Sequence, residues 1–493
     1  MHVRVSRAVA LLVAVVAMAA MVLNPAPPAV ADGDSGLALG PVRVSEGLRN
    51  DLASSPSDTP YGVFAHFATP TPDGGRQHLA DFGLRVVDTF DSVNVAFAIG
   101  TLGDVRALTH SPKLTFLERN EELAYAGETA SWATRARVAQ QAIAGGPYRD
   151  AAGRIIDGAG VGVAIIDSGA DSPHPDLANR IVKNYKVECS FVLVYTESGR
   201  CYPDPIELDP GTPSDTTSGH GTHVAGIVAG DGTASNGTFR GAAPGASLFT
   251  FGVGEGLNVF FAAQAYDFIV GEYDTFSPRI RVINNSYGNP AGTDYDPENV
   301  ISKLVAQATE LGVTSVFAAG NDGSDADTGD ADDTSGYAKD PTPGVITVAN
   351  YDDAGAGSRN NTLDTSSSRG LAGNPANYPD IAAPGASITS TCNPRLSLCN
   401  LGPNPAYQPY YAYMSGTSMA SPNIAGIAAL LYQARPDLTP AQVEDVLQDT
   451  AHKFTGGASA PGAYEADPQN PGSTISYDKG AGLVDVPAAL NAL

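Results

Sequence analysis

Three side chains of the types that cooperate in acyl transfer stand in separate short motifs, as Asp167, His220 and Ser418. Asp167 follows an apolar run, His220 opens the segment His220–Ala229, and Ser418 heads another apolar segment with helical character. A serine hydroxyl is a weak nucleophile and needs a base that takes its proton as it attacks. A histidine supplies that base when a buried carboxylate fixes its tautomer. We therefore predict Asp167 as the orienting acid, His220 as the general base and Ser418 as the nucleophile.

Asn321 is a fourth polar group of interest, because it lies just beyond the apolar run Val313–Ala318. Attack on a carbonyl group places negative charge on its oxygen, and N–H donors that face this oxygen stabilise the transition state. We expect the side-chain amide of Asn321 to donate to that oxygen beside the backbone N–H of Ser418.

The elements that must position these groups follow a strand–helix alternation from about residue 127 onward. This pattern predicts an α/β fold with a doubly wound, mostly parallel sheet and helices on both faces. Ligands of such sheets bind at the carboxyl ends of strands, and both Asp167 and Asn321 follow a strand. The expected strands are 161–166, 246–251, 281–284, 313–318 and 345–349, and the expected helices are 220–229, 258–270, 299–311 and 419–433.

A smaller α+β domain is expected ahead of this sheet, over residues 60–126, after a linker at 32–59. The order is strand, helix, strand, strand, helix, strand, which is the split βαβ pattern of ferredoxin-like domains. The expected strands are 61–67, 84–90, 93–99 and 114–118, and the expected helices are 75–82 and 102–109.

The first 31 residues are typical of a secretory signal peptide. Arg4 and Arg7 precede the apolar stretch Ala8–Leu23, and Ala29-Val30-Ala31 provides small residues for cleavage. We therefore expect a secreted, extracellular protein with no membrane segment after cleavage.

The four cysteines suit an oxidising compartment and allow three pairings. Cys189 and Cys201 are close in sequence, and so are Cys392 and Cys399, which favours two local disulfides.

The chain carries 53 acidic and 28 basic side chains, a formal charge of −25. Nucleic-acid partners require clustered Lys and Arg, so we expect none. The negative charge favours solubility, and recruitment of basic peptides by an acidic cleft stays open as an alternative. We expect a monomer.

The chain resembles the subtilisin-like serine proteases, the subtilases. The resemblance implies a secreted endopeptidase that acts through an acyl-enzyme, with Asp167, His220, Ser418 and Asn321 in the roles given above and polypeptides as substrates. The matching motifs are Asp167-Ser168-Gly169, His174-Pro175-Asp176-Leu177, His220-Gly221-Thr222-His223, Ala319-Gly320-Asn321, Ala382-Ala383-Pro384-Gly385, Gly416-Thr417-Ser418-Met419-Ala420 and Gly480-Ala481-Gly482-Leu483-Val484.

The same resemblance assigns roles outside the triad. Residues 60–126 resemble the family's inhibitory propeptide, which implies a self-processing zymogen cut near Ala126. Ser286, Tyr287 and Gly288 match the family segment that pairs with the substrate backbone and edges the pocket for the residue before the scissile bond. Insertions at 186–217 and 391–411 depart from the family pattern and are expected to shape the rim of the cleft, so no side-chain preference is assigned.

Several alternatives stay open. Asp176 matches a calcium ligand of the family, although residues 231–239 resemble the partner loop poorly, so structural calcium is undecided. No metal or cofactor is assigned to the chemistry: His220 and His223 lie three apart, whereas a zinc-protease helix spaces its histidines four apart around a glutamate. An esterase would carry a Gly-x-Ser-x-Gly turn. A catalytically silent scaffold of the same fold is the remaining alternative.

Overall fold

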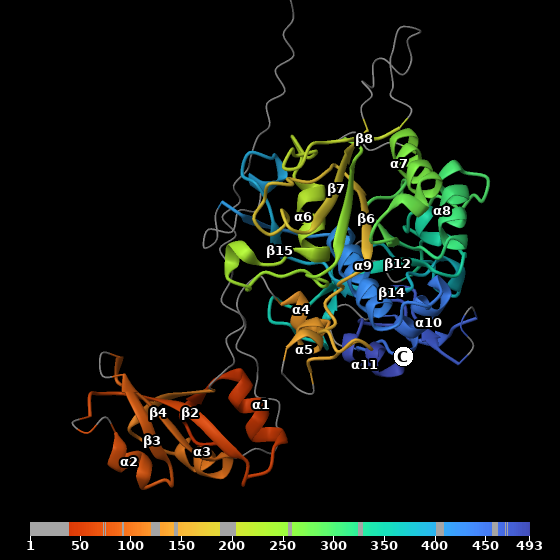
Figure 1. Cartoon of the computed structure of the whole chain (residues 1–493). Helices are drawn as coiled ribbons and strands as arrows, with labels where there is room; N and C mark the ends of the chain where they lie inside the picture. The colour runs from red at the N-terminus through yellow and green to blue at the C-terminus, as the bar shows by residue number, and fades with distance from the viewer. Residues whose placement is uncertain are drawn as a thin grey trace, which may run out of the picture. The chain divides into compact units, whose positions relative to one another are not determined.

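The computed structural model divides into two compact units, Met1–Leu123 and Ala124–Leu493, close to the boundary expected at residue 126 (Figure 1). It describes residues 39–493 except 72, 74, 91–92, 120–128, 142–145, 188–203, 255–258, 324–328, 401–408, 456–461, 469 and 471. The predicted signal peptide, Cys189, Cys201 and the expected cleavage point near Ala126 lie outside these residues.

The first unit is a five-stranded sheet in the order β1-β5-β2-β4-β3. The short β1 runs parallel to β5, and every other pairing is antiparallel. Its elements are β1 (Arg43–Val44), α1 (Glu46–Ser54), β2 (Pro60–Phe67), α2 (Arg76–Ala80), β3 (Arg85–Phe90), β4 (Val95–Thr101), α3 (Leu102–Leu108) and β5 (Leu114–Arg119).

Part of the expected linker 32–59 belongs to this folded unit, which corrects the sequence-based boundary. It contains β1 and α1, and Leu48 and Leu52 of α1 are fully buried in the core of the unit. These leucines are four residues apart and therefore lie on one face of the helix. That spacing was the signal available in the sequence.

The second unit contains a nine-stranded sheet in the order β13-β12-β11-β10-β6-β9-β7-β8, with β14 paired to β12. Only the pairings of β13 and β8 are antiparallel, so the sheet is mostly parallel as expected. The strands are β6 (Gly162–Asp167), β7 (Ile181–Lys186), β8 (Ile206–Glu207), β9 (Ser247–Gly252), β10 (Ile280–Asn285), β11 (Thr314–Ala318), β12 (Val345–Asp352), β13 (Thr362–Leu363) and β14 (Ile381–Pro384).

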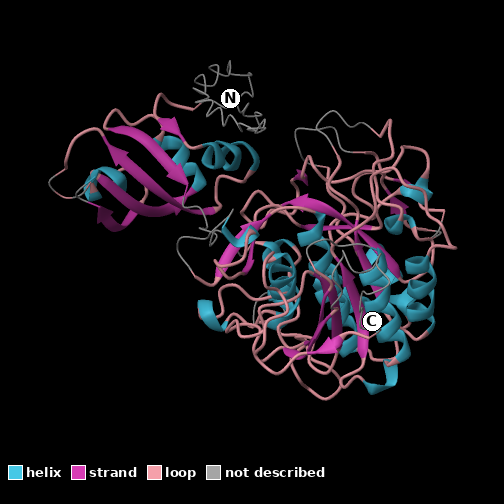
Figure 2. Cartoon of the chain, turned by 90° about the horizontal axis from the view of Figure 1, so that it is seen from above, coloured by secondary structure: helices cyan, strands magenta, loops and turns pink. Residues whose placement is uncertain are grey.

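Helices cover both faces of this sheet (Figure 2). Successive residues of a strand point to opposite faces. Val163 and Ile165 of β6 therefore pack with residues of α6 (His220–Ala229) and α9 (Thr417–Ala434). Ala164 and Ile166 pack with residues of α7 (Val259–Gly271) and α8 (Val300–Glu310).

The remaining elements surround this core. Thr439 and Gln442 form a capping box at the start of α10. The elements are α4 (Ala130–Ala133), α5 (Ala136–Gln140), α10 (Pro440–Asp449), α11 (Val486–Ala492), the hairpin of β15 (Ile388–Thr391) and β16 (Tyr411–Met414), and the hairpin of β17 (Glu465–Ala466) and β18 (Thr474–Ile475).

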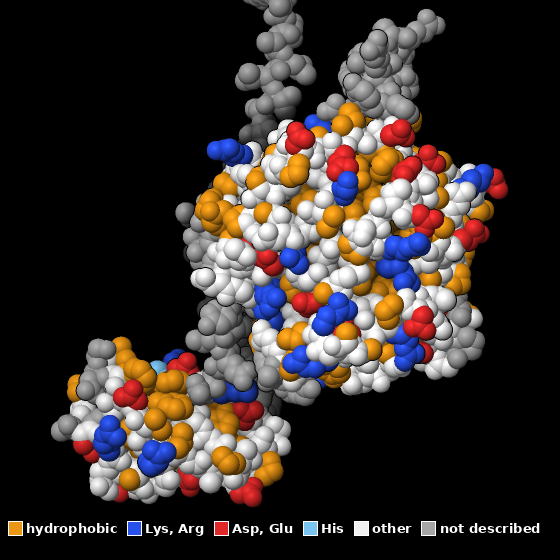
Figure 3. Space-filling model, in the orientation of Figure 1, with side chains coloured by type: hydrophobic (Ala, Val, Ile, Leu, Met, Phe, Trp, Pro, Cys, Tyr) orange, Lys and Arg blue, Asp and Glu red, His pale blue; other side chains and the backbone are white. Residues whose placement is uncertain are grey.

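Two surface properties bear on partners. None of the helices in the described ranges is long and apolar enough to cross a membrane. On the face of the larger unit that Figure 3 shows, Lys and Arg side chains are interspersed with Asp and Glu. That face carries no broad basic patch of the kind that binds a phosphate backbone.

Candidate active site

Asp167 is the last residue of β6 and is completely buried. Its Oδ1 accepts a hydrogen bond of 2.8 Å from Nδ1 of His220 and one of 2.7 Å from the backbone N–H of Ser168. The carboxylate thus fixes the ring orientation of His220 and leaves Nε2 available as a base. This hydrogen bond joins two residues that are 53 positions apart in the chain.

His220 is the first residue of α6 and follows Gly219, whose φ of 93° favours glycine. Burial acts to lower the pKa of His220, but the charge and hydrogen bond of Asp167 and the charge of Asp215 outweigh it. The pKa of His220 is therefore raised above its usual value.

Asp215 is a buried carboxylate near this site that the sequence reasoning missed. It accepts hydrogen bonds from the backbone N–H groups of Ser218, Gly219 and Thr222, at 3.0–3.2 Å. It also accepts one of 2.8 Å from the Thr222 hydroxyl. Asp215 thereby satisfies free N–H groups at the start of α6 and places a negative charge where helix N-termini favour one. The available signal was an acidic residue five positions before His220.

Ser418 is the second residue of α9, not the residue directly before the helix. Its Oγ donates a hydrogen bond of 3.0 Å to the backbone carbonyl of Ser286 at the end of β10. Among the described residues no hydrogen bond joins Ser418 to His220. Such contacts are often loose in a free enzyme and tighten when substrate binds.

Asn321 lies just beyond β11 and contacts the start of α9. Its Oδ1 accepts hydrogen bonds from the backbone N–H of Thr417, at 2.8 Å, and from the Thr417 hydroxyl, at 3.1 Å. Because Oδ1 is held by these donors, the orientation of the amide is fixed, and Nδ2 remains to donate elsewhere.

One cavity of about 410 Å³ brings three of the predicted residues together. Asp167 does not line this cavity and contacts His220 from outside it. The cavity is lined by His220, Asn321, Leu398, Tyr413, Met414, Ser415, Ser418 and Met419.

Comparison with known proteins places this site in a family. The sequence profile of the subtilase family matches residues 158–481, which contain all four predicted site residues. The chain belongs to the subtilase family. It is 35% identical to serine protease AprX of Bacillus subtilis, over 61% of this chain and 63% of that protein. It is 33% identical to a subtilisin of Bacillus pumilus, over 67% of this chain and 91% of that protein.

Solved structures support the fold. The crystal structure of fervidolysin from Fervidobacterium pennivorans, a keratinolytic enzyme related to subtilisin, aligns with a TM-score of 0.50. The alignment covers 91% of this chain and 63% of that chain at 21% identity, and so shows the fold alone. This subtilase spans less than two thirds of the length of both fervidolysin and AprX.

The predicted substrate-binding residues Ser286, Tyr287 and Gly288 do not line the cavity that holds Ser418. Ser286 lies beside the nucleophile: its hydroxyl donates to the Ser418 carbonyl at 2.8 Å. Tyr287 packs against the core under α7 and α8, and its hydroxyl donates to Asn285 Oδ1 at 2.8 Å.

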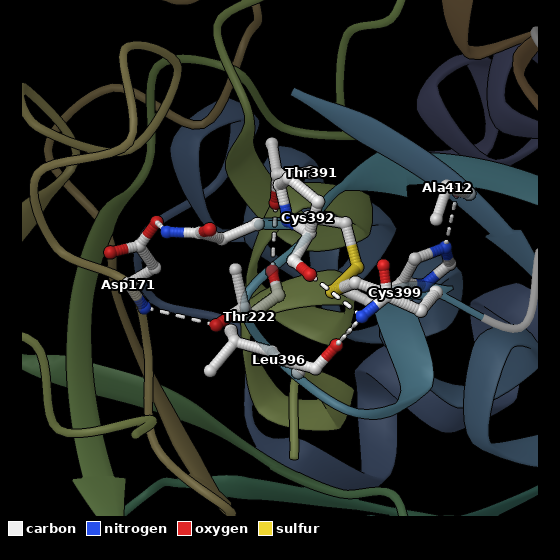
Figure 4. The surroundings of a disulfide bond; sticks show 12 residues. Asp171, Thr222, Thr391, Cys392, Leu396, Cys399 and Ala412 are labelled. Carbon is white, nitrogen blue, oxygen red and sulfur yellow. Dashed lines mark hydrogen bonds between the residues drawn. A yellow bond between two sulfur atoms is a disulfide. The ribbon is translucent and has the colours of Figure 1, made fainter. Parts of the chain in front are cut away.

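Cys392 and Cys399 form a disulfide, as the sequence predicted (Figure 4). Thr391 precedes it, and its hydroxyl donates to the carbonyl of Thr222 in α6 at 2.7 Å. The disulfide therefore lies against the helix that His220 opens.

Asp176 of this subtilase, whose motif suggests a calcium ligand, is hydrogen-bonded to protein groups. Its Oδ1 accepts a hydrogen bond of 2.7 Å from the backbone N–H of Ala234, and its Oδ2 accepts one of 2.6 Å from the Tyr411 hydroxyl. Within the described ranges no three His, Cys, Asp or Glu side chains are grouped to hold a metal ion.

His223 is likewise occupied by protein contacts. Its Nε2 lies 3.0 Å from the carbonyl of Ile388 and 3.1 Å from that of Ala412. Burial lowers its pKa to about 3, so the ring is neutral and donates to these carbonyls. This histidine ties α6 to the β15–β16 hairpin.

Proposed function

We propose that this chain is a secreted serine endopeptidase that hydrolyses polypeptides through an acyl-enzyme. The observation that carries the proposal is the 2.8 Å contact of Asp167 with His220, next to a cavity that His220 shares with Ser418 and Asn321. The identity of this chain to named serine proteases supports the same reaction class.

The reaction follows from the position of each group. Ser418 Oγ attacks the scissile carbonyl carbon as its proton passes to His220 Nε2, and Asp167 stabilises the imidazolium that forms. The first step requires the Ser418 hydroxyl to turn from the Ser286 carbonyl toward His220. The oxyanion accepts hydrogen bonds from the backbone N–H of Ser418 and from Asn321 Nδ2.

Collapse of the tetrahedral intermediate completes the acyl transfer. The C–N bond breaks, His220 protonates the departing amine, and Ser418 remains esterified to the carbonyl carbon. Water then attacks this ester, with His220 as base again, and releases the carboxylic acid and the free serine.

The first unit, in this proposal, is a ferredoxin-like inhibitory propeptide removed by self-cleavage near Ala126. The family resemblance and the separate core of the unit support this role. Residues 1–31 direct export before maturation.

The test compares the intact mass of the secreted wild-type protein with that of Ser418→Ala. We expect the wild type to have lost everything up to about residue 126 and the variant to retain it. A fluorophosphonate probe, which reacts with activated serines, should label the wild type and not the variant. For a triad, loss of the serine is expected to lower kcat by about a million-fold.

Each other outcome points to a different conclusion. If both proteins are cut alike, an external protease matures the chain, and labelling alone decides activity. If neither protein is cut or labelled, the proposal is wrong and the catalytically silent scaffold is the better description.

A further inference from the structure

The disulfide Cys392–Cys399 closes a compact loop between β15 and β16. Both cysteines are buried with Leu396 and Ala412 in a small apolar cluster, against which Met414 also packs (Figure 4). The backbone N–H of Cys392 donates to the carbonyl of Tyr410 at 2.8 Å. Residues 392–399 are therefore held at Cys392 by the hairpin and closed at Cys399 by the disulfide.

The loop is also bonded to the segment that leads into His220. The N–H of Ser397 donates to the carbonyl of Thr217 at 2.8 Å, and the N–H of Leu398 donates to the carbonyl of Ser218 at 2.9 Å. Cys399 packs directly on Gly219, where a Cβ atom would lie 2.6 Å from the cysteine sulfur. Only glycine fits between the disulfide and His220.

These bonds hold the backbone of Leu398 at the rim of the cavity that contains Ser418. Leu398 is partly exposed and lines this cavity together with Tyr413, Met414 and Met419. These four largely apolar side chains therefore line the same cavity as His220 and Ser418. Such a wall binds an apolar side chain by removing it from water.

The position of the cavity indicates which substrate residue it receives. It is lined by His220, the group that would hand its proton to the departing amine, and not by Ser286, Tyr287 or Gly288. The segment 286–288 is the one predicted to bind the chain before the scissile bond. The cavity therefore faces the residue that follows the bond.

We propose that Leu398, held in place by the disulfide loop, is a specificity-determining residue that selects an apolar side chain directly after the scissile bond. This inference rests on the proposed endopeptidase activity and names its substrate class. Leu398 lies in the insertion at 391–411, outside the family motifs of the sequence.

The expected size of the effect follows from pocket chemistry. A single methylene in a hydrophobic pocket discriminates by about 10- to 200-fold in kcat/KM. Leu398→Ala removes apolar surface from the lining of the cavity without adding charge. We expect the preference for Leu over Ser after the scissile bond to fall by about 10-fold or more, mainly through loss of turnover of the Leu peptide.

The experiment uses internally quenched peptides that differ only in the residue after the bond, with Leu, Phe, Ala or Ser at that position. Mass spectrometry of the products identifies the bond that is cut. Wild type should prefer Leu and Phe, and Leu398→Ala should lose that preference. Leu371→Ala, which changes an exposed leucine outside the cavity, is the matched control and should behave as wild type.

A second variant, Cys392→Ser/Cys399→Ser, tests whether the disulfide loop holds Leu398 in place. It should lose the apolar preference, and kcat should also fall for every peptide because the loop holds Thr217 and Ser218.

Fluorophosphonate labelling counts the catalytically competent sites in each protein. A labelled, active wild type without apolar preference, or a Leu398→Ala variant with an unchanged preference, overturns the inference. Absence of labelling and cleavage in the wild type instead overturns the proposed function on which it rests.

Discussion

At the scale of single residues, His220 is balanced between a buried environment and two carboxylates. Burial lowers its pKa, whereas the charge and hydrogen bond of Asp167 and the charge of Asp215 raise it, and the carboxylates prevail. Asp167 contacts the ring, while Asp215 acts through the backbone of Ser218, Gly219 and Thr222 and through its charge. Asp215 is therefore a positioning residue that also influences the protonation of the base.

This balance predicts the pH dependence of activity. Only neutral His220 accepts the proton of Ser418, so kcat/KM should rise with pH through a midpoint above the usual histidine pKa of about 6.5. Asp215→Asn removes one negative charge and should shift the midpoint to lower pH. The measurement is the pH profile of kcat/KM, with exposed Asp209→Asn as the control. An unchanged midpoint in Asp215→Asn would show that this charge does not reach His220.

Asn321→Asp separates the two roles of that side chain. An aspartate oxygen still accepts from the Thr417 N–H, but the Nδ2 donor is lost. We expect kcat to fall by at least about 100- to 1,000-fold, the effect of removing one oxyanion donor, because the new carboxylate charge also repels the oxyanion, with KM nearly unchanged. Steady-state kinetics of a mature variant give both constants. A KM effect without a kcat effect would place Asn321 in substrate binding instead.

At the scale of elements, the His174–Leu177 motif holds the strand that leads to the nucleophile. His174 Nε2 donates to the carbonyl of Tyr410 at 2.8 Å, and Asp176 accepts from the Tyr411 hydroxyl at 2.6 Å. Burial and the neighbouring Asp176 raise the pKa of Tyr411, so its hydroxyl stays protonated and donates. The motif therefore anchors β16 by hydrogen bonds between protein groups.

This anchor predicts that calcium removal leaves the motif intact. In the Ser418→Ala background, the change in Tm caused by Asp176→Asn should be the same with and without a chelator. Tyr411→Phe should lower the free energy of unfolding by about 1–3 kcal/mol, because it leaves an oxygen of the buried Asp176 without its donor. Tyr410→Phe is the neighbouring control. A chelator-induced fall in Tm that disappears in Asp176→Asn would instead make Asp176 a calcium ligand.

At the scale of the whole molecule, some acidic side chains are buried in positions where their carboxyl groups resist ionisation. Burial raises the pKa of Asp380 to about 7, and the charge of Asp467 adds to the effect. Burial, with the charge of Asp380, also raises the pKa of Glu444 well above its usual value. Gln448 Nε2 lies 3.4 Å from both carboxylates and links α10 to the segment before β14.

The raised pKa of Asp380 gives a pH-dependent stability with a defined sign. The folded state holds this proton more tightly than the unfolded state, whose pKa is about 3.9. The contribution is therefore complete below about pH 4 and is lost as pH rises through about 7. In the Ser418→Ala background, Asp380→Asn should raise Tm above pH 7 and leave it unchanged near pH 4. Exposed Asp437→Asn is the control, and equal Tm values for Asp380→Asn and its parent at pH 8 would contradict the prediction.

Features that depend on nearby residues could be predicted from the sequence. The strands β6, β9, β10, β11 and β12 and the helices α6 to α9 each correspond to an apolar run or pattern within 20 residues, and their expected bounds agree with the structure to within a few residues. The mostly parallel sheet follows from their alternation. The two-residue β1 was missed because so short a strand leaves no periodic pattern, whereas α1 was missed although Leu48 and Leu52 marked its buried face.

The sequence by itself determined the residue types at the site, because Asp167, His220, Asn321 and Ser418 each stand in a motif of a few residues beside a strand end or a helix start. Only the tertiary structure decided which groups from distant parts of the chain support these residues and their motifs. Tyr411 on Asp176 and Leu398 at the rim of the cavity act through contacts between segments that no local pattern connects. Tyr411 and Asp176 are 235 residues apart, and only the packing of β16 against the motif brings them to 2.6 Å. Interactions between residues close in the chain determine which helices and strands form, whereas packing between distant segments determines which side chains come into contact.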